Sequence, residues 1–274
     1  MAAASAITSA WLPPLLWRLL EAEFAAWRRL GHVPQLWWRD DDARVPTPAL
    51  DRLIALARRT RVPVALAVIP DRDLRPLAAT IAGEALVCAI QHGCDHQDRG
   101  EPGPSAEFHP DAPPDEVAAK ISAAWGRLAA ATGAAPVYAP PWNVATPNVV
   151  RALAHTPLRA LSLYGGDPVD TAGLVALNAH IDIMRWGPAR FRGASAILER
   201  LRKLLRMRRA AGDWRQPIGF LTHHKNLDPA AWTFLEDLLT RTSQPATVAT
   251  WRSAPSLLEE FAAPLPLQGE RVGR

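Results

Sequence analysis

The feature that most constrains the fold of this chain is a repeated alternation of short apolar segments with amphipathic helical patterns. The expected strands are 35–39, 62–69, 85–90, 136–139, 159–163, 174–184, 217–221 and 246–250. They are apolar on both faces, which is typical of a parallel sheet covered by helices. Seven or eight such units in one continuous chain favour a (β/α) barrel over an open sheet.

Start signals for helices support this division of the chain. Thr47-Pro48, Thr146-Pro147 and Asp228-Pro229 each place a capping residue before a proline at the first helical position. No Gly-x-Gly-x-x-Gly follows the first strand, which argues against a dinucleotide-binding fold. No linker divides the sequence. We therefore expect a single domain over residues 1–274, in which residues 1–33 form an N-terminal helical extension with an amphipathic helix at 10–30.

The charge, the cysteine content and the N-terminal residues limit the partners and the compartment that we expect. The net charge is +4, and much of the basicity lies in residues 190–215, which we interpret as a solvated helix face. No basic-aromatic array resembles a nucleic-acid module, so no nucleic-acid partner is expected. The two cysteines, Cys88 and Cys94, make no disulfide framework, and residues 1–20 lack the basic region of a secretory signal. These features predict a cytoplasmic protein.

Polar residues gather just past the ends of four predicted strands. They are Asp40-Asp41-Asp42, His92 with His96, Pro141-Trp142-Asn143, and His223. Active sites of (β/α) barrels are built at that rim. Two histidines four positions apart share a face if the segment coils, and two imidazoles with a carboxylate suit a divalent ion such as Zn²⁺.

In this order the motifs resemble those of the polysaccharide deacetylase family, also called the NodB-homology domain or carbohydrate esterase family 4. That family has a Thr-Phe-Asp-Asp-Gly motif, a His-Ser/Thr-x-x-His motif, an Arg-x-Pro-Tyr/Trp-type motif and a late Leu-x-His. The counterparts here are Trp38-Arg39-Asp40-Asp41-Asp42, His92-Gly93-Cys94-Asp95-His96, Ala139-Pro140-Pro141-Trp142 and Leu221-Thr222-His223.

The resemblance implies a distorted (β/α) barrel, here of about seven parallel strands, and an acyl hydrolase that acts on a carbohydrate. Position by position, it makes Asp40 the general base and Asp41, His92 and His96 the metal ligands. It also gives the backbone N–H of Trp142 to the oxyanion and makes His223 the general acid. The cofactor is then a divalent ion, with Zn²⁺ preferred, and the substrate carries N-acetyl or O-acetyl groups.

This sequence departs from the family pattern at several positions. Asp42 replaces the glycine of the first motif, Gly93 replaces the Ser/Thr of the second, and Ala139 replaces the arginine of the third. Arg185-Trp186 stands where the family has Asp-Trp. The third departure removes the usual partner of the base, and Asp182 is a candidate partner for His223.

Two other functions fit part of this set of residues. Paired aspartates also hold Mg²⁺ for phosphate chemistry, but that reading leaves the histidine pair unexplained. Two histidines and a carboxylate also suit non-haem Fe(II) oxygenases, against which the strand and helix alternation argues. His224 competes with His223 for the late role.

Two broader alternatives remain open at this point. One is a deformylase or deacetylase of a lipid-linked sugar at the membrane face, supported by the N-terminal amphipathic helix and the basic helix; membrane association is not favoured. The other is a catalytically silent barrel that binds carbohydrate.

Overall fold

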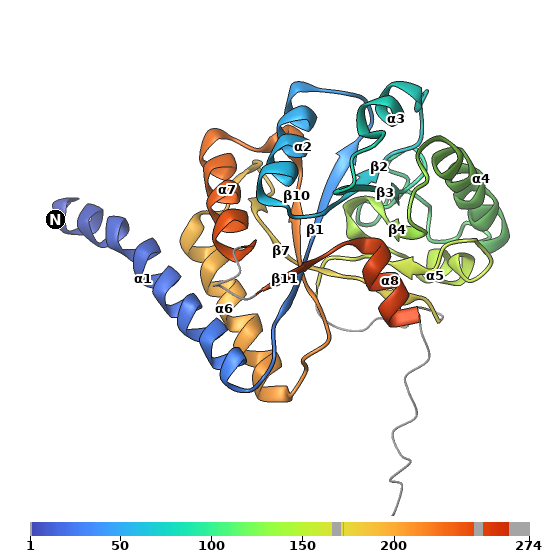
Figure 1. The fold of residues 1–274 in the computed structure, drawn as a ribbon. Coiled ribbons are helices and arrows are strands. Elements are labelled where there is room, and N and C mark those ends of the chain that lie inside the picture. The colour runs from blue at the N-terminus through green and yellow to red at the C-terminus, as the bar shows by residue number, and fades with distance from the viewer. Residues whose placement is uncertain (1, 166–170, 172, 244–248, 263–274) are drawn as a thin grey trace, which may run out of the picture.

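The computed structural model describes residues 2–165, 171, 173–243 and 249–262. The elements in chain order are α1 (Ala2–Arg29), β1 (Gln35–Ala43), α2 (Pro48–Thr60), β2 (Val64–Val68), α3 (Arg75–Ile81), β3 (Val87–His92), α4 (Pro114–Thr132), β4 (Val137–Ala139), η1 (Pro141–Asn143), α5 (Pro147–Leu153), β5 (Ala160–Leu161), β6 (Val175–Ala176), β7 (Ala179–Asp182), β8 (Met184–Arg185), β9 (Arg190–Phe191), α6 (Ala194–Ala211), β10 (Ile218–Thr222), η2 (His224–Asn226), α7 (Pro229–Ser243), β11 (Thr250–Arg252) and α8 (Ala254–Ala262). Figure 1 shows the helices arranged around a twisted central sheet.

The sheet is parallel and runs in the order β6-β5-β4-β3-β2-β1-β10-β7, with β11 paired to the first residues of β1. Its two ends meet. The Ala179 N–H donates to the Leu163 carbonyl at 2.8 Å, and the Gly165 N–H donates to the Ala179 carbonyl at 2.8 Å. With β6 and β7 counted as one interrupted strand, β11 left aside, the result is a closed, uneven barrel of seven parallel strands. The predicted fold class is confirmed.

Several boundaries differ from those expected. The segment 174–184 divides into β6, β7 and β8, and β8 pairs with β9 as a small antiparallel hairpin beside the barrel. The first strand continues through the acidic triplet to Ala43. Of the expected strand 246–250, residues 246–248 lie outside the described residues, and β11 begins at Thr250. The cap at Thr47 is confirmed, because its hydroxyl accepts the Leu50 N–H at 3.1 Å.

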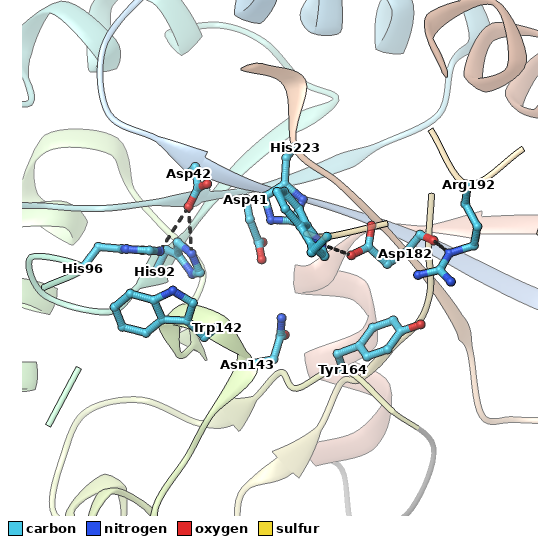
Figure 2. A pocket seen from close by; sticks show the side chains of 11 residues that line it. Asp41, Asp42, His92, His96, Trp142, Asn143, Tyr164, Asp182, Arg192 and His223 are labelled. Carbon is cyan, nitrogen blue, oxygen red and sulfur yellow. Dashed lines mark hydrogen bonds and ion pairs between the residues drawn. The ribbon is translucent and has the colours of Figure 1, made fainter. Parts of the chain in front are cut away.

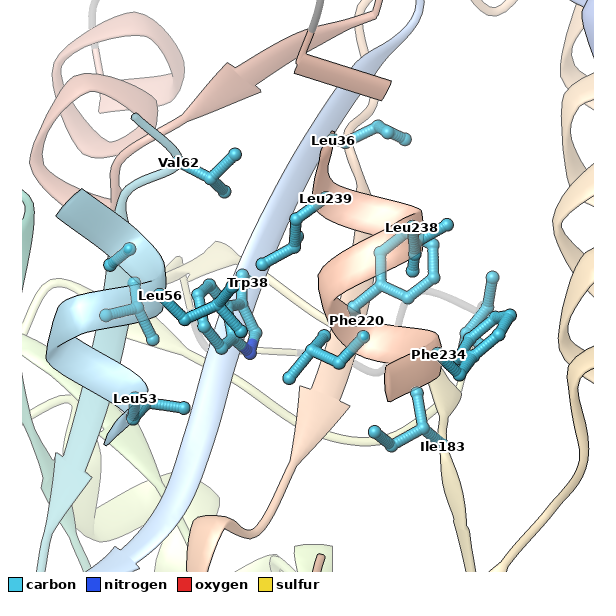
Figure 3. Close-up of a cluster of buried hydrophobic side chains, with 14 of the residues drawn as sticks. Leu36, Trp38, Leu53, Leu56, Val62, Ile183, Phe220, Phe234, Leu238 and Leu239 are labelled. Carbon is cyan, nitrogen blue, oxygen red and sulfur yellow. The ribbon is translucent and has the colours of Figure 1, made fainter. Parts of the chain in front are cut away.

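Alternation along β1 sends neighbouring side chains to opposite sides of the barrel wall. Trp38 points outward, where it packs with Phe220 of β10 beneath helices α2 and α7 (Figure 3). Trp37 belongs to the second cluster, with small residues of β2 and β4 and with Leu257 and Leu258 of α8. Arg39 and Asp41 share the inward direction of Trp37, and this places charged groups inside the barrel above an apolar floor.

Helix α1 is longer than the expected helix at 10–30 and is partly built into the domain. Leu20, Phe24 and Trp27 belong to the main core cluster. The Trp27 indole donates to the Leu205 carbonyl of α6 at 3.2 Å. Figure 1 shows α1 lying along α6, with its N-terminal end projecting past the barrel. Among the described residues, no helix has the length and hydropathy needed to cross a bilayer.

Candidate active site

A cavity of about 540 Å³ opens at the carboxyl ends of the strands, where the sequence predicts the site. Figure 2 shows its lining. The lining residues are Asp41, Asp42, His92, His96, Trp142, Asn143, Tyr164, Asp182, Trp186, Arg192 and His223. Residues from all four predicted strand ends are thus brought together, and of the predicted rim residues only Asp40 and Pro141 are absent from the lining.

The carboxylate that meets the two histidines is that of Asp42. Its Oδ1 lies 3.3 Å from Nε2 of His92 and 3.4 Å from Nε2 of His96. Asp42 has φ 70°, and the β1–β2 register shifts between Asp40 and Ala43. This local kink breaks the alternation of the strand, so that Asp42 turns toward the cavity although Asp41 already faces it. Burial raises the pKa of Asp42, but hydrogen bonds from His92 and His96 outweigh it and hold that pKa far below its usual range.

His92 ends β3 and is buried. Its Nδ1 lies 2.9 Å from the Ala139 carbonyl, which can only accept, so Nδ1 carries a proton and Nε2 is the nitrogen directed at Asp42. Although burial lowers the pKa of His92, the charges of Asp41 and Asp42 outweigh it and raise that pKa.

His96 lies in the turn that follows β3, with φ 57°. Its ring centroid is 4.5 Å from that of Trp142. Cys94, between the two histidines, is half-buried. Burial, reinforced by the charges of Glu107 and Asp95, raises the pKa of the Cys94 thiol.

Asp41 is held by Arg39 inside the barrel, where both side chains are almost fully buried. Nη2 of Arg39 donates to Oδ2 of Asp41 at 3.0 Å, and Nε approaches Oδ1 at 2.9 Å as an ion pair. The guanidinium also donates to the Ser162 carbonyl and hydroxyl at 2.8 and 2.7 Å and to Oδ1 of Asn143 at 2.5 Å. A bidentate, doubly anchored arginine fixes the orientation of the carboxylate it faces.

Asp40 faces away from the cavity. Its Oδ1 lies 2.5 Å from Nδ1 of His224, and its Oδ2 accepts the Thr222 hydroxyl at 2.5 Å and the His224 N–H at 3.0 Å. Asp40 is completely buried. These contacts join β1 to the turn that carries His223.

The contact with the histidines that was expected of Asp41 is therefore made by the next residue, Asp42. Asp40, the expected base, is a buried partner of His224, and Asp41, the expected ligand, is the partner of Arg39. The carboxylate that joins the histidines is Asp42, which aligned with a glycine of the motif. The reason is the kink at Asp42, which alternation alone does not anticipate.

Trp142 and Asn143 follow β4 in a short 3-10 turn with positive φ at both residues. The Trp142 N–H has no acceptor among the residues that the structure describes, as is usual in the first turn of a helix. Trp142, Tyr164 and Trp186 are 38%, 45% and 47% exposed and make an aromatic rim around the cavity.

His223, rather than His224, lines the cavity. Its ring meets that of Trp186 edge to face, with centroids 4.6 Å apart. Nδ1 of His223 is buried without a partner among the described residues, so Nε2 is the nitrogen open to the cavity. Asp182, the suggested partner of His223, accepts instead from the Met184 N–H at 2.8 Å and the Trp186 indole at 2.7 Å. Burial raises the pKa of Asp182.

The donor set fits a divalent cation. The ligand atoms of Asp42, His92 and His96 lie within 4.8 Å of one another. Two ligands about 2.0–2.1 Å from one tetrahedral ion are about 3.4 Å apart, which agrees with the separations of 3.3 and 3.4 Å. One carboxylate and two imidazoles leave further positions open for water and substrate.

Comparisons with known proteins agree with this architecture. The sequence matches no family model and no curated protein. The structure matches a putative polysaccharide deacetylase from Mycobacterium smegmatis, with 16% identity, TM-score 0.58 and coverage of 82% of each chain. It also matches a family 4 acetyl xylan esterase from Clostridium thermocellum in complex with a cobalt ion, with 12% identity, TM-score 0.53 and coverage of 84% of this chain and 92% of that one.

A third match is the Puue allantoinase, with 14% identity, TM-score 0.57 and coverage of 78% of this chain and 72% of that one. At these identities the matches establish the fold. The chain therefore has the distorted (β/α) barrel fold of the polysaccharide deacetylases, which the motifs had indicated.

Several residues at the site, Arg39, Tyr164 and Arg192, had no role in the prediction from the sequence. Arg39 was noted only as a motif neighbour, although a charge within an otherwise apolar strand is itself a signal. Tyr164 and Arg192 line the cavity without belonging to a recognisable pattern. Their loops are brought together only by closure of the barrel.

Proposed function

We propose that this protein is a metal-dependent hydrolase that removes an acetyl group from an N- or O-acetylated carbohydrate. The observation that carries the proposal is the meeting of Asp42, His92 and His96 at the mouth of a deacetylase-type barrel, with a second carboxylate and a third histidine in the same cavity. A carbohydrate-binding barrel has no need of such a set.

Asp42, His92 and His96 hold the cation, and this donor set favours Zn²⁺ or a similar ion. When bound, the ion supplies Lewis-acid activation of the acyl carbonyl and of the attacking water. The cobalt complex of the Clostridium thermocellum esterase supports a divalent ion.

Asp41 takes the proton of the attacking water, since it faces the cavity next to the ligand Asp42. Arg39 keeps Asp41 oriented through its hydrogen bond and ion pair. In the resemblance the third motif supplies an arginine to the base, and position 139 here is a buried alanine. Arg39 contacts Asp41 from β1 instead, and this contact supports Asp41 as the base despite that departure.

The Trp142 N–H donates to the developing oxyanion, and Nε2 of His223 protonates the departing amine or alcohol. Trp186, whose indole donates to Asp182, packs against the ring of His223 and holds it at the cavity wall. The aromatic rim of Trp142, Tyr164 and Trp186 suits the apolar faces of sugar rings.

The fold alone does not choose the substrate, because the Puue allantoinase shares it. A cyclic amide is therefore the second substrate class to test.

Both cysteines are free thiols, which supports the proposal of a cytoplasmic protein.

The experiment is acetate release from N-acetylated and O-acetylated oligosaccharides by zinc-loaded and chelated protein, with allantoin hydrolysis measured in parallel. We expect acetate release that chelation abolishes and that Asp41→Asn lowers by about 10²–10⁴-fold. Turnover of allantoin alone would overturn the carbohydrate assignment, and full activity after chelation would overturn the metal mechanism.

A further inference from the structure

The turn that carries His96 closes around a carboxylate from the long loop between β3 and α4. Oε1 of Glu107 accepts three consecutive backbone N–H groups, those of Cys94 at 2.7 Å, Asp95 at 2.8 Å and His96 at 2.7 Å. Its Oε2 accepts the Tyr138 hydroxyl at 3.3 Å. Successive N–H groups that converge in this way form an anion-binding nest, and here the anion is part of the chain.

Glu107 is committed to this nest. It is 3% exposed, and its own backbone is fixed, because the Arg99 guanidinium donates to its carbonyl at 3.0 Å. Phe108 beside it packs in the cluster of α4 and α5. Burying a carboxylate is costly unless its oxygens are satisfied, so four donors of this kind define one position for the side chain.

The nest also explains the glycine in the histidine motif. A Cβ at Gly93 would lie 2.5 Å from Oε1 and 2.7 Å from Oε2 of Glu107, and 2.6 Å from Cγ of Pro141. Gly93 has φ 62° as well, a conformation that L residues rarely adopt. The carboxylate thus occupies the space that the Ser or Thr of the related motif would need.

His96 depends on this arrangement. With φ 57° it holds a left-handed conformation that non-glycine residues rarely adopt, because it is strained for them. The hydrogen bond from its own N–H to Glu107 offsets that strain. Its Nε2 thereby comes within 3.4 Å of Asp42, while its side chain stays 21% exposed and its ring contacts those of His92 and Trp142.

We propose that Glu107 is the positioning residue for the metal ligand His96. Its carboxylate binds the nest of residues 94–96 and presets the histidine before the cation arrives. This inference rests on the metal site of the proposed function. It adds to that site a residue that touches neither cation nor substrate and acts through one ligand only.

The test is a double-variant cycle on zinc affinity, measured by competition with a chromophoric chelator. Outer partners of metal ligands contribute about 10–100-fold to affinity, so Glu107→Ala should weaken zinc binding by that factor. In a His96→Ala background the same change should weaken it less than about threefold, because the ligand through which Glu107 acts is already gone. In a His92→Ala background the full loss should return.

Glu107→Gln provides the conservative comparison, since it keeps a neutral acceptor for the three N–H groups and loses the charge. Its loss of zinc affinity should be smaller than that of Glu107→Ala, and it carries the cycle if the alanine variant does not fold. Glu116→Gln, an exposed acid at the start of α4, is the matched control and should bind zinc as wild type does.

Equal losses in the wild-type and His96→Ala backgrounds would overturn the inference, since they would show a general effect on the fold. Wild-type affinity in Glu107→Ala would overturn it as well. Failure of the wild-type protein to bind zinc is a different result, because it would overturn the proposed metal site itself.

Discussion

At the scale of single residues, Arg39 is the group on which the inner site depends. It lies inside the barrel with no exposed surface, and its positive charge is balanced there by Asp41. A buried ion pair of this kind is expensive to break from one side, because the remaining charge is left unpaired. The pairing of Arg39 with Asp41 is thus part of what holds the inner wall of the barrel together.

We therefore predict strong coupling between these two residues. Arg39→Met should lower the free energy of unfolding by about 3–5 kcal/mol, because it leaves Asp41 buried without a counter-charge. The pair Arg39→Met with Asp41→Asn should lose less than the sum of the single changes. Urea unfolding of the four proteins measures this. The exposed pair Arg59 and Glu236 is the control and should show almost no coupling. Additive losses at Arg39 and Asp41 would contradict this account.

The residues of the site were predictable to different degrees. His92, His96 and His223 follow strand ends, and their type and spacing mark them in the sequence. The acidic triplet was predicted as part of the site, with Asp40 as base and Asp41 as ligand, but the carboxylate that meets the histidines is that of Asp42, because the kink at Asp42 is a tertiary feature. The sequence could not show that Arg39 takes the place of an arginine at position 139. That inference requires knowing that both positions face the barrel interior.

At the scale of elements, helix α1 is more than an extension. The sequence predicted its amphipathic face, but an apolar stripe does not say which element it packs against. The structure shows that partner to be α6, through the bond from Trp27 to Leu205 and an ion pair between Glu23 and Arg209 at 2.6 Å. The short strands β5 and β6 were harder to delimit, because two-residue strands carry no periodicity.

Trp27→Ala should therefore destabilise the whole domain. Trp27 is 1% exposed, and truncation of a buried tryptophan costs about 3–5 kcal/mol through lost burial and the cavity that remains. Leu19→Ala on the same helix is the comparison, because Leu19 is 38% exposed and should change stability by less than about 0.5 kcal/mol. Thermal and urea unfolding supply the measurement; a similar small effect for both would show that α1 does not share the core.

At the scale of the whole molecule, barrel closure is what makes a site from dispersed residues. β1, β3, β4 and β10 end at the same rim, and each delivers one part of the cavity lining. The fold class was predictable because parallel strands buried on both faces are uniformly apolar. The exact closure through residues 163–165 and 179 was not, since it rests on two backbone hydrogen bonds.

The most direct test of the account is the metal content of three purified proteins, the wild type, Asp42→Asn and Asp41→Asn, after identical zinc loading and dialysis. The geometry predicts one zinc per chain in the wild type and in Asp41→Asn, and a large loss in Asp42→Asn, because Asp42 is the carboxylate that meets His92 and His96. The reverse pattern, with Asp41→Asn emptied and Asp42→Asn loaded, would contradict the assignment of ligand and base.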